Sequence, residues 1–289
     1  MSQAVGKPSP LILITNHMDA WGVTFTIVSV FIFLHQTVNR DTIILLIGLT
    51  LAYWFGFAVN DYFDADIDVE SPDKVKRNFF IHYPVSKTVF FLFLGIVIML
   101  ATGIGFYQFG VTGILSAIVA LFIVWGYSSP PLRLKSRPGL DLLTHALFVQ
   151  TFPYLICLIL ADVPVIAVDY VMLAFFFFSS LSAQLEQQIR DYEIDKLSDS
   201  NFTVQFGKSV SGGLLTIFTI VPIAILTVGF LSGILPVFML PLVGAGVPLA
   251  FHRFLRGQNA PRSEKLIRVI MVIVLIYVTM LWIGLIGFY

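Results

Sequence analysis

The stretch TIILLIGLTLAYWFGFAVNDYFDADID, residues 42–68, decides the fold class. It carries no charged residue from Thr42 to Asn60 and then places four aspartates within its last eight positions. An apolar run of about 20 residues is long enough to cross the hydrocarbon core of a bilayer as a helix. The stretch therefore predicts a membrane-spanning helix that ends in a group of acids at the membrane surface.

The rest of the chain shares this apolar character. Of its 289 residues, 57% are hydrophobic and 12% are charged, and the mean hydropathy is +0.91. Soluble domains are about 45–50% apolar and about 25% charged, so an ordinary soluble fold is excluded. The net charge is zero, which gives no reason to expect a nucleic-acid partner. The one cysteine, Cys157, excludes an intramolecular disulfide.

Nine segments are apolar and long enough to span a bilayer. They are residues 11–36, 42–62, 86–107, 109–128, 140–161, 166–190, 210–231, 234–252 and 265–288. No long linker divides the chain, and the first segment lacks the cleavage pattern of a signal peptide. We therefore predict an all-α polytopic membrane protein, a single domain over residues 1–289, with nine transmembrane helices in one bundle around a central cavity.

The positive charges gather on one side of this topology. Of the 17 Lys and Arg residues, all except Arg40 lie in the N-terminal segment or in and beside the loops that follow even-numbered spans. Loops rich in Lys and Arg stay on the cytoplasmic side. We expect an integral protein of the cell membrane whose N-terminus and active-site loops are cytoplasmic and whose C-terminus is outside.

A first aspartate-rich motif ends the second predicted span. Its Asn60, Asp64 and Asp68 are four residues apart, so they share one face of a helix, and Asp61 flanks that face. Acids at the end of a membrane helix are rare and usually functional. The spacing predicts that these side chains act together on a ligand.

A second motif ends the sixth predicted span, where Asp191 and Asp195 repeat the four-residue spacing at the same membrane face. Two carboxylates about 4 Å apart repel by about 4 kcal/mol at an effective dielectric constant of about 20, so convergence of the motifs would require a cation. Mg²⁺ takes one or two carboxylates and commonly also binds substrate phosphate. The two motifs together with a diphosphate would form a complete ligand set for Mg²⁺.

The loop after the fourth predicted span reads YSSPPLRLK, residues 127–135. Its prolines end the helix, and Arg133 and Lys135 then lie on the same membrane face as the aspartates. Arg binds phosphate oxygens in a bidentate manner and Lys binds them as a point charge. We predict that both hold a diphosphate and that Tyr127 donates a hydrogen bond to its leaving oxygen.

These motifs together resemble the UbiA superfamily of intramembrane prenyltransferases. NDYFDADID at 60–68 is similar to the first aspartate motif of that family, and the pair Asp191 and Asp195 is similar to the second. The run at 127–135 resembles the loop between helices 4 and 5, and Thr203 to Gly207 resembles a segment before helix 7. With the helix number and the order of motifs, the resemblance covers essentially the whole chain.

The resemblance implies Mg²⁺-dependent transfer of an isoprenyl chain from a polyprenyl diphosphate to a lipophilic acceptor within the membrane, through diphosphate departure and an allylic carbocation. It implies metal binding by Asn60, Asp64, Asp68, Asp191 and Asp195, and substrate binding by Asn60, Asp61, Arg77, Arg133 and Lys135. It places Asp64, Asp68, Asp191, Asp195 and Tyr127 in catalysis. Many members follow the first motif with Arg-Pro-Ile-Pro-Ser-Gly, whereas this chain has KRNFFIHYPVS at 76–86, where Arg77 is the clear match.

Other functions remain open on the sequence alone. We expect an acceptor of the aromatic, quinone-precursor type, and a carotenoid or a glycerol phosphate is the alternative. A cation-coupled transporter is a second class, but transporter sites usually lie near the bilayer midplane rather than at one interface. Transferases acting on CDP-alcohols carry a D-x-x-D-G-x-x-A-R run, whereas here Val69 and Glu70 follow the motif.

Overall fold

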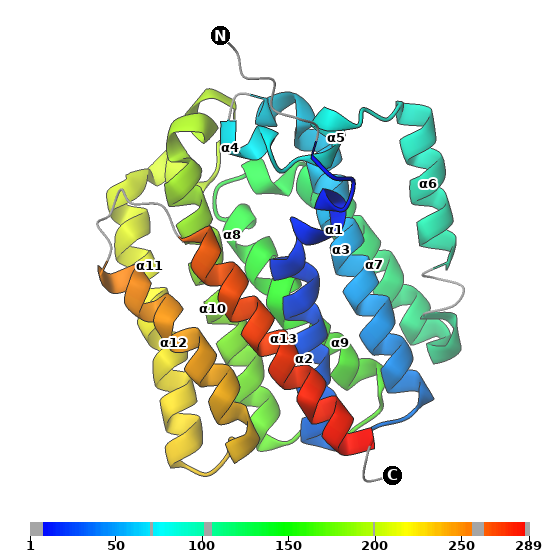
Figure 1. Ribbon diagram of the computed structural model, residues 1–289, viewed down its shortest axis with the longest axis vertical. Helices are drawn as coiled ribbons and strands as arrows, with labels where there is room; N and C mark the ends of the chain where they lie inside the picture. The colour runs from blue at the N-terminus through cyan, green and yellow to red at the C-terminus, as the bar shows by residue number, and fades with distance from the viewer. Residues whose placement is uncertain (1–7, 70–71, 101–105, 199, 256–262, 287–289) are drawn as a thin grey trace.

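The computed structural model describes residues 8–69, 72–100, 106–198, 200–255 and 263–286, and these residues form a helical bundle without strands (Figure 1). The helices are α1 (Ile12–Thr15), α2 (Met18–His35), α3 (Arg40–Asp68), α4 (Pro72–Val75), α5 (Phe79–His82), α6 (Lys87–Leu100), α7 (Gly110–Ser128), α8 (Leu140–His145), α9 (Phe152–Leu160), α10 (Ala167–Ser198), α11 (Phe202–Leu231), α12 (Leu240–Leu255) and α13 (Glu264–Ile286). A six-residue π-helix, Ala146–Thr151, joins α8 to α9.

The all-α membrane class is confirmed. In the described part of the chain, eight helical segments are long and apolar enough to cross a bilayer, and the shorter apolar helix α6 takes the place of the third predicted span. Residues 101–105 of that span lie outside the described residues, as do Lys7, Arg256 and Arg262 from the charge argument.

The first predicted span is divided in two. The chain leaves helical geometry at His17, which has φ −107° and ψ 24°, so that α1 and α2 are separate helices. The His17 ring lies within hydrogen-bonding distance of Asp61 on α3, 2.7 Å from its Oδ2. A polar residue inside an apolar span therefore marks a break at which the chain reaches the first aspartate motif.

The core lies in the middle of the bundle, where α2, α3, α9 and α10 meet. Its most enclosed side chains are fully or almost fully buried, among them Val28, Phe31, Leu49, Tyr154 and Met172. Many large apolar side chains instead face outward, including Leu92, Ile118, Leu231 and Ile283. A soluble monomer rarely exposes so much contiguous apolar surface, and a surrounding bilayer explains it.

The bundle has one polar end. The C-terminal ends of α3 and α10 lie there together with α4, α5 and the loop before α8 (Figure 1). Helix α6 stands at the edge of the bundle in the same view, and Phe90 is its one buried side chain among the described residues. The fold thus brings the ends of two long helices, far apart in sequence, to the mouth of one interior space.

Candidate active site

A cavity of about 240 Å³ lies inside the bundle, lined by α3, α7, α8, the π-helix and α10. Its polar end carries Asn60, Asp64, Lys74, Lys135, Asp191 and Asp195. Its body is apolar and includes Leu49, Phe106, Leu121, Phe148 and Phe152. From Asp64 down to Leu49 the lining covers about 22 Å of α3, at 1.5 Å of rise per residue. The cavity can therefore hold a charged head group at one end and a hydrocarbon chain below it.

The first motif meets the loop before α8 at the mouth of this cavity. Lys135 Nζ lies 2.5 Å from both carboxylate oxygens of Asp64 and donates to Asn60 Oδ1 at 3.1 Å. Ser128, the last residue of α7, also donates to Asn60 Oδ1, at 2.6 Å. Arg133 lies farther away, with its Nη2 3.8 Å from Asp64 Oδ1. The predicted convergence of Asn60, Asp64 and Lys135 is present in the structure.

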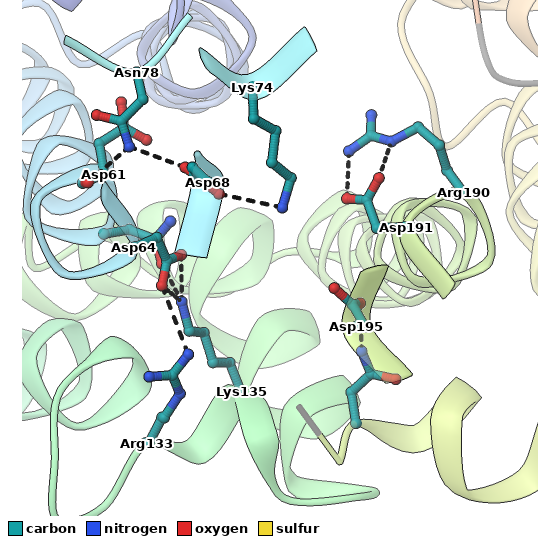
Figure 2. A network of polar contacts seen from close by, with 12 residues as sticks. Asp61, Asp64, Asp68, Lys74, Asn78, Arg133, Lys135, Arg190, Asp191 and Asp195 are labelled. Carbon is teal, nitrogen blue, oxygen red and sulfur yellow. Dashed lines mark hydrogen bonds and ion pairs between the residues drawn. The ribbon is translucent and has the colours of Figure 1, made fainter. Parts of the chain in front are cut away.

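Asp68, one turn beyond Asp64, is buried and held by two residues of the following loop (Figure 2). Asn78 Nδ2 donates to Asp68 Oδ2 at 2.9 Å and also to the main-chain oxygen of Asp61 at 2.8 Å. Lys74 Nζ lies 3.4 Å from Asp68 Oδ1. The side chain of Asp68 does not line the cavity itself, but its partner Lys74 does.

The second motif stands on the opposite wall, at the end of α10 (Figure 2). Asp191 accepts two hydrogen bonds from the neighbouring Arg190, at 2.7 and 2.8 Å. Asp195 accepts one from Asn201 Nδ2 at 2.7 Å. Both carboxylates line the cavity, and so does Asn201. The two motifs therefore face one interior space, as their spacing predicts.

Lys74 lies between the two motifs, in the direction of both Asp68 and Asp191 (Figure 2). Burial opposes its charged form, but four surrounding carboxylates outweigh burial and raise its pKa: those of Asp191, Asp68, Asp195 and Asp64. Lys74 is therefore a fixed positive charge at the centre of the acidic group. No sequence pattern marks Lys74 as a site residue, although it is the first cation after the first motif.

Besides Asp68 and Arg133, two more predicted site residues, Asp61 and Arg77, lie away from the cavity lining. Asp61 is buried against His17, because its position on α3 turns it away from the face of Asp64 and toward the α1–α2 break. Arg77 is partly exposed and lies 3.5 Å from Glu264 at the start of α13. Glu264 also accepts a hydrogen bond from Arg190 at 3.1 Å. The structure thus joins Arg77 to the second motif through Glu264 and Arg190.

Tyr127 lines the cavity near the end of α7, and its hydroxyl oxygen accepts a hydrogen bond from Gln184 of α10 at 3.2 Å. This hydrogen bond joins α7, which leads into the YSSPPLRLK loop, to α10, which carries the second aspartate motif. Tyr127 is thus at the polar half of the cavity, where the sequence places it.

A buried polar network holds the second motif from behind. Asp141 is fully buried, accepts from Gln188 at 2.6 Å and accepts from the backbone N–H of Phe202 at 2.7 Å. Thr203 donates to Gln188 Oε1 through both its backbone N–H and its hydroxyl, at 3.1 and 3.0 Å. Gln188 is one turn before Asp191, so the network fixes this end of α10 against α8 and α11. No local sequence pattern pairs Asp141 with Gln188.

The residues present fit a Mg²⁺ ion that is shared with a substrate phosphate. Their donors at the polar end are carboxylate and amide oxygens, the ligands that Mg²⁺ prefers. Among the described residues, no three acidic, histidine or cysteine side chains lie close enough together to hold a metal alone. Mg²⁺ takes only one or two carboxylates when phosphate and water complete its shell, so Asp64 on one wall and Asp191 with Asp195 on the other suffice.

Comparison with known proteins finds solved structures of the same fold. A solved UbiA homolog from Archaeoglobus fulgidus bound to GPP and Mg²⁺ is 18% identical, with a TM-score of 0.70 over 93% of this chain and 98% of that one. The same homolog bound to DMAPP and Mg²⁺ is 17% identical, with a TM-score of 0.71 over 94% and 98%. At this identity the likeness shows a shared fold.

No curated protein matches the chain. The model of the UbiA prenyltransferase family matches residues 22–276, which is most of its length. This protein therefore belongs to the UbiA prenyltransferase family.

Proposed function

We propose that this prenyltransferase moves an isoprenyl chain from its diphosphate to a lipophilic acceptor inside the membrane, with the diphosphate at the carboxylate-lined end of the cavity. The observation that carries the proposal is the cavity itself. One end places carboxylates of both motifs beside Lys74 and Lys135, and the other end is a long apolar wall. A prenyl diphosphate has the same division into a charged head and a hydrocarbon tail. The A. fulgidus homolog of the same fold binds GPP and Mg²⁺, which supports a prenyl diphosphate as the substrate.

Asn60, Asp64 and Asp68 would hold one Mg²⁺, and Asp191 with Asp195 would hold another. The ions would neutralise negative charge on the departing diphosphate, as a Lewis acid does. The protein's own cations act beside them. Lys135 and Lys74 reach the space between the motifs, and Arg133 lies just behind Lys135, so these side chains would bind diphosphate oxygens as the C1–O bond breaks.

The apolar wall would then protect the allylic cation from water. The cavity below the polar end is enclosed by side chains of α3, α7 and α10 and by the π-helix. Water that reached C1 would capture the cation as an alcohol, so exclusion of water is required for transfer. The same wall favours an acceptor that is itself lipophilic, of the aromatic quinone-precursor type, with a carotenoid or a glycerol phosphate as the alternative to be tested.

A direct test measures diphosphate release and prenylated product by the purified protein in detergent. Geranylgeranyl diphosphate would be supplied with and without Mg²⁺, across aromatic, carotenoid and glycerol phosphate acceptors. The proposal expects release that needs both Mg²⁺ and one class of acceptor. A folded protein that releases no diphosphate with any of them, and instead carries cations across liposomes, would support the transporter alternative.

Asp64→Ala and Asp191→Ala should each abolish transfer, because each removes a carboxylate from one side of the proposed metal site. We expect losses of about 10²- to 10³-fold, the range attributed to removal of a group that stabilises developing charge. Asp66→Ala is the matched control, since Asp66 belongs to the same motif but is exposed to solvent. Equal activity of Asp64→Ala and Asp66→Ala would contradict the assignment of the first motif.

A further inference from the structure

His145 is a titratable side chain in the apolar wall of the cavity that the proposed chemistry has not yet used. It is the last residue of α8 and lines the cavity beside Thr144 and Phe148. The charged residues of the lining all lie at the polar end. Apart from them, His145 is the one side chain of the described lining that can act as a base toward a proton on carbon. Its position corresponds to the hydrocarbon part of a bound substrate.

The hydrogen bonds of His145 fix which ring nitrogen carries the hydrogen. Ser180, fully buried on α10, donates its hydroxyl hydrogen to the backbone oxygen of His145 at 2.9 Å. The same hydroxyl oxygen lies 3.0 Å from His145 Nδ1. A hydroxyl has a single hydrogen, and it is used in the first contact. Ser180 must therefore accept from Nδ1–H in the second, which places the hydrogen of the neutral ring on Nδ1.

In this tautomer Nε2 carries the lone pair. No side chain of the described residues forms a hydrogen bond or ion pair with Nε2. The backbone supports the same arrangement, because α8 ends at His145 and the chain continues as the π-helix Ala146–Thr151. Single π-helical turns are frequent at functional sites. Tyr53 donates its hydroxyl to the backbone oxygen of Phe148 within that turn, and so fixes the turn against α3.

We propose that Nε2 of His145 is the proton acceptor of the reaction and that the acceptor substrate attacks through carbon, as an arene or an alkene. The inference rests on the proposed function. The C1–O bond breaks and its electron pair leaves with diphosphate. A π-bond of the acceptor then forms the new bond to C1, which leaves a cation on the acceptor. Loss of a proton from the acceptor to Nε2 restores the π-bond.

The resulting imidazolium keeps its Nδ1–H bond to Ser180, and the extra proton passes to solvent when the products leave the cavity. Ser180 is eleven residues before Asp191 on α10, about 16 Å of helix. The long side chains at the polar end and the diphosphate itself occupy part of that length, so His145 lies on the side of C1 away from the leaving group. An acceptor carbon bonded to C1 would lie in this part of the cavity.

The experiment compares wild type with His145→Gln, which keeps a polar side chain but cannot take up a proton. Geranylgeranyl diphosphate and whichever probe acceptor the wild type uses, 4-hydroxybenzoate or lycopene, are supplied with Mg²⁺. Diphosphate, prenylated acceptor and free prenyl alcohol are measured separately. We expect diphosphate release to continue, while prenylated acceptor falls about 10²-fold, the lower range for loss of a general base, and prenyl alcohol rises. An arene acceptor deuterated at the attacked carbon should show a larger isotope effect in the variant, because that carbon loses the proton.

Two further variants complete the test. Ser180→Ala removes the group that fixes the tautomer but keeps the imidazole, so it should shift the products in the same direction to a smaller extent. His252→Gln changes a histidine of α12 outside the cavity lining and serves as the matched control.

Unchanged product formation in His145→Gln would overturn the proposal and would leave the diphosphate as the base. Loss of diphosphate release in a His145→Gln protein whose melting temperature equals that of the wild type would also overturn the proposal. His145 would then act in breaking the C1–O bond. Use of glycerol phosphate alone by the wild type would overturn the carbon acceptor. Absence of any diphosphate release by the wild type would instead contradict the proposed function.

Discussion

Single residues at the polar end of the cavity supply a partner for each carboxylate of the proposed metal site. Asp64 is paired with Lys135, Asp68 with Lys74, and Asp195 with Asn201. Lys74 has the widest influence, because it feels the carboxylates of both motifs and its pKa is raised by them despite burial. A lysine whose pKa is raised above its normal value stays charged across the neutral range and loses its proton only at higher pH. Any alkaline fall in activity near pH 8 must therefore arise from another group.

Lys74→Met should weaken binding of the prenyl diphosphate while leaving the fold intact. A hydrogen bond to a charged group contributes about 1.5–3 kcal/mol, which corresponds to a rise in KM for the diphosphate of about tenfold to 100-fold. The measurement is the KM for geranylgeranyl diphosphate at saturating Mg²⁺. Lys76→Met, which changes an exposed cation of the same loop, is the control. A KM in Lys74→Met equal to that of the control would remove Lys74 from the site.

Among the elements, α12 depends on a polar contact for its place in the bundle. No side chain of its described residues is buried, yet its Arg253 reaches α10 and α11. Arg253 donates through Nε to Glu186 at 3.1 Å and through Nη1 to Thr219 at 3.0 Å, and Ser182 also accepts from it. Glu186 is buried on α10. The ion pair is thus an inward anchor of α12, which also packs against α13 and, through Leu242 and Val243, against the main core.

Arg253→Met should destabilise the protein by about 3–5 kcal/mol, because it removes the cation that is hydrogen-bonded to the buried carboxylate of Glu186. The double variant Arg253→Met with Glu186→Leu should recover much of the loss, since no charge then remains buried. Arg268→Met on the exposed face of α13 is the control. The measurement is the melting temperature of each variant in detergent, which ranks their stabilities. A double variant less stable than Arg253→Met would contradict the explanation.

The sequence predicts some elements and misses others for physical reasons. Span positions follow from apolar length alone, and the facing of Asp64 and Asp191 follows from four-residue spacing at helix ends. Asp61 shows where spacing is insufficient: it is three residues from Asp64, and that offset turns it toward His17 instead of the cavity. Asn78 and Asp141 act through partners distant in sequence, and no local pattern records such contacts.

For the whole molecule, the distribution of cations predicts that the carboxylate end faces the cytoplasm. Arg40 lies at the opposite end of α3 from the acids, whereas Lys74, Lys135 and Arg190 lie beside them. Loops with excess Lys and Arg are retained on the cytoplasmic side. The two ends of the bundle should therefore differ in their access to reagents that cannot cross a membrane.

Cysteine labelling tests this orientation. Cys157 is fully buried, so it adds little background. Asp66→Cys lies at the carboxylate end, and Asp162→Cys lies between α9 and α10 at the other end; both positions are exposed. In intact cells a membrane-impermeant maleimide should label Asp162→Cys alone, and both should react after lysis. Labelling of Asp66→Cys in intact cells would reverse the topology.

The pairing of each carboxylate within the protein makes the binding of metal and diphosphate mutually dependent. A metal ion arriving alone must displace Lys135 from Asp64 or Lys74 from Asp68, and a diphosphate arriving alone meets lysines that already have partners. When both arrive, the carboxylates and the lysines exchange partners and no charge is left uncompensated. Such coupling is reciprocal, so each ligand should tighten the binding of the other by the same factor. Without ligands the site is close to electrically neutral. Its carboxylates and lysines exchange their partners for ligands only when metal and diphosphate are both present.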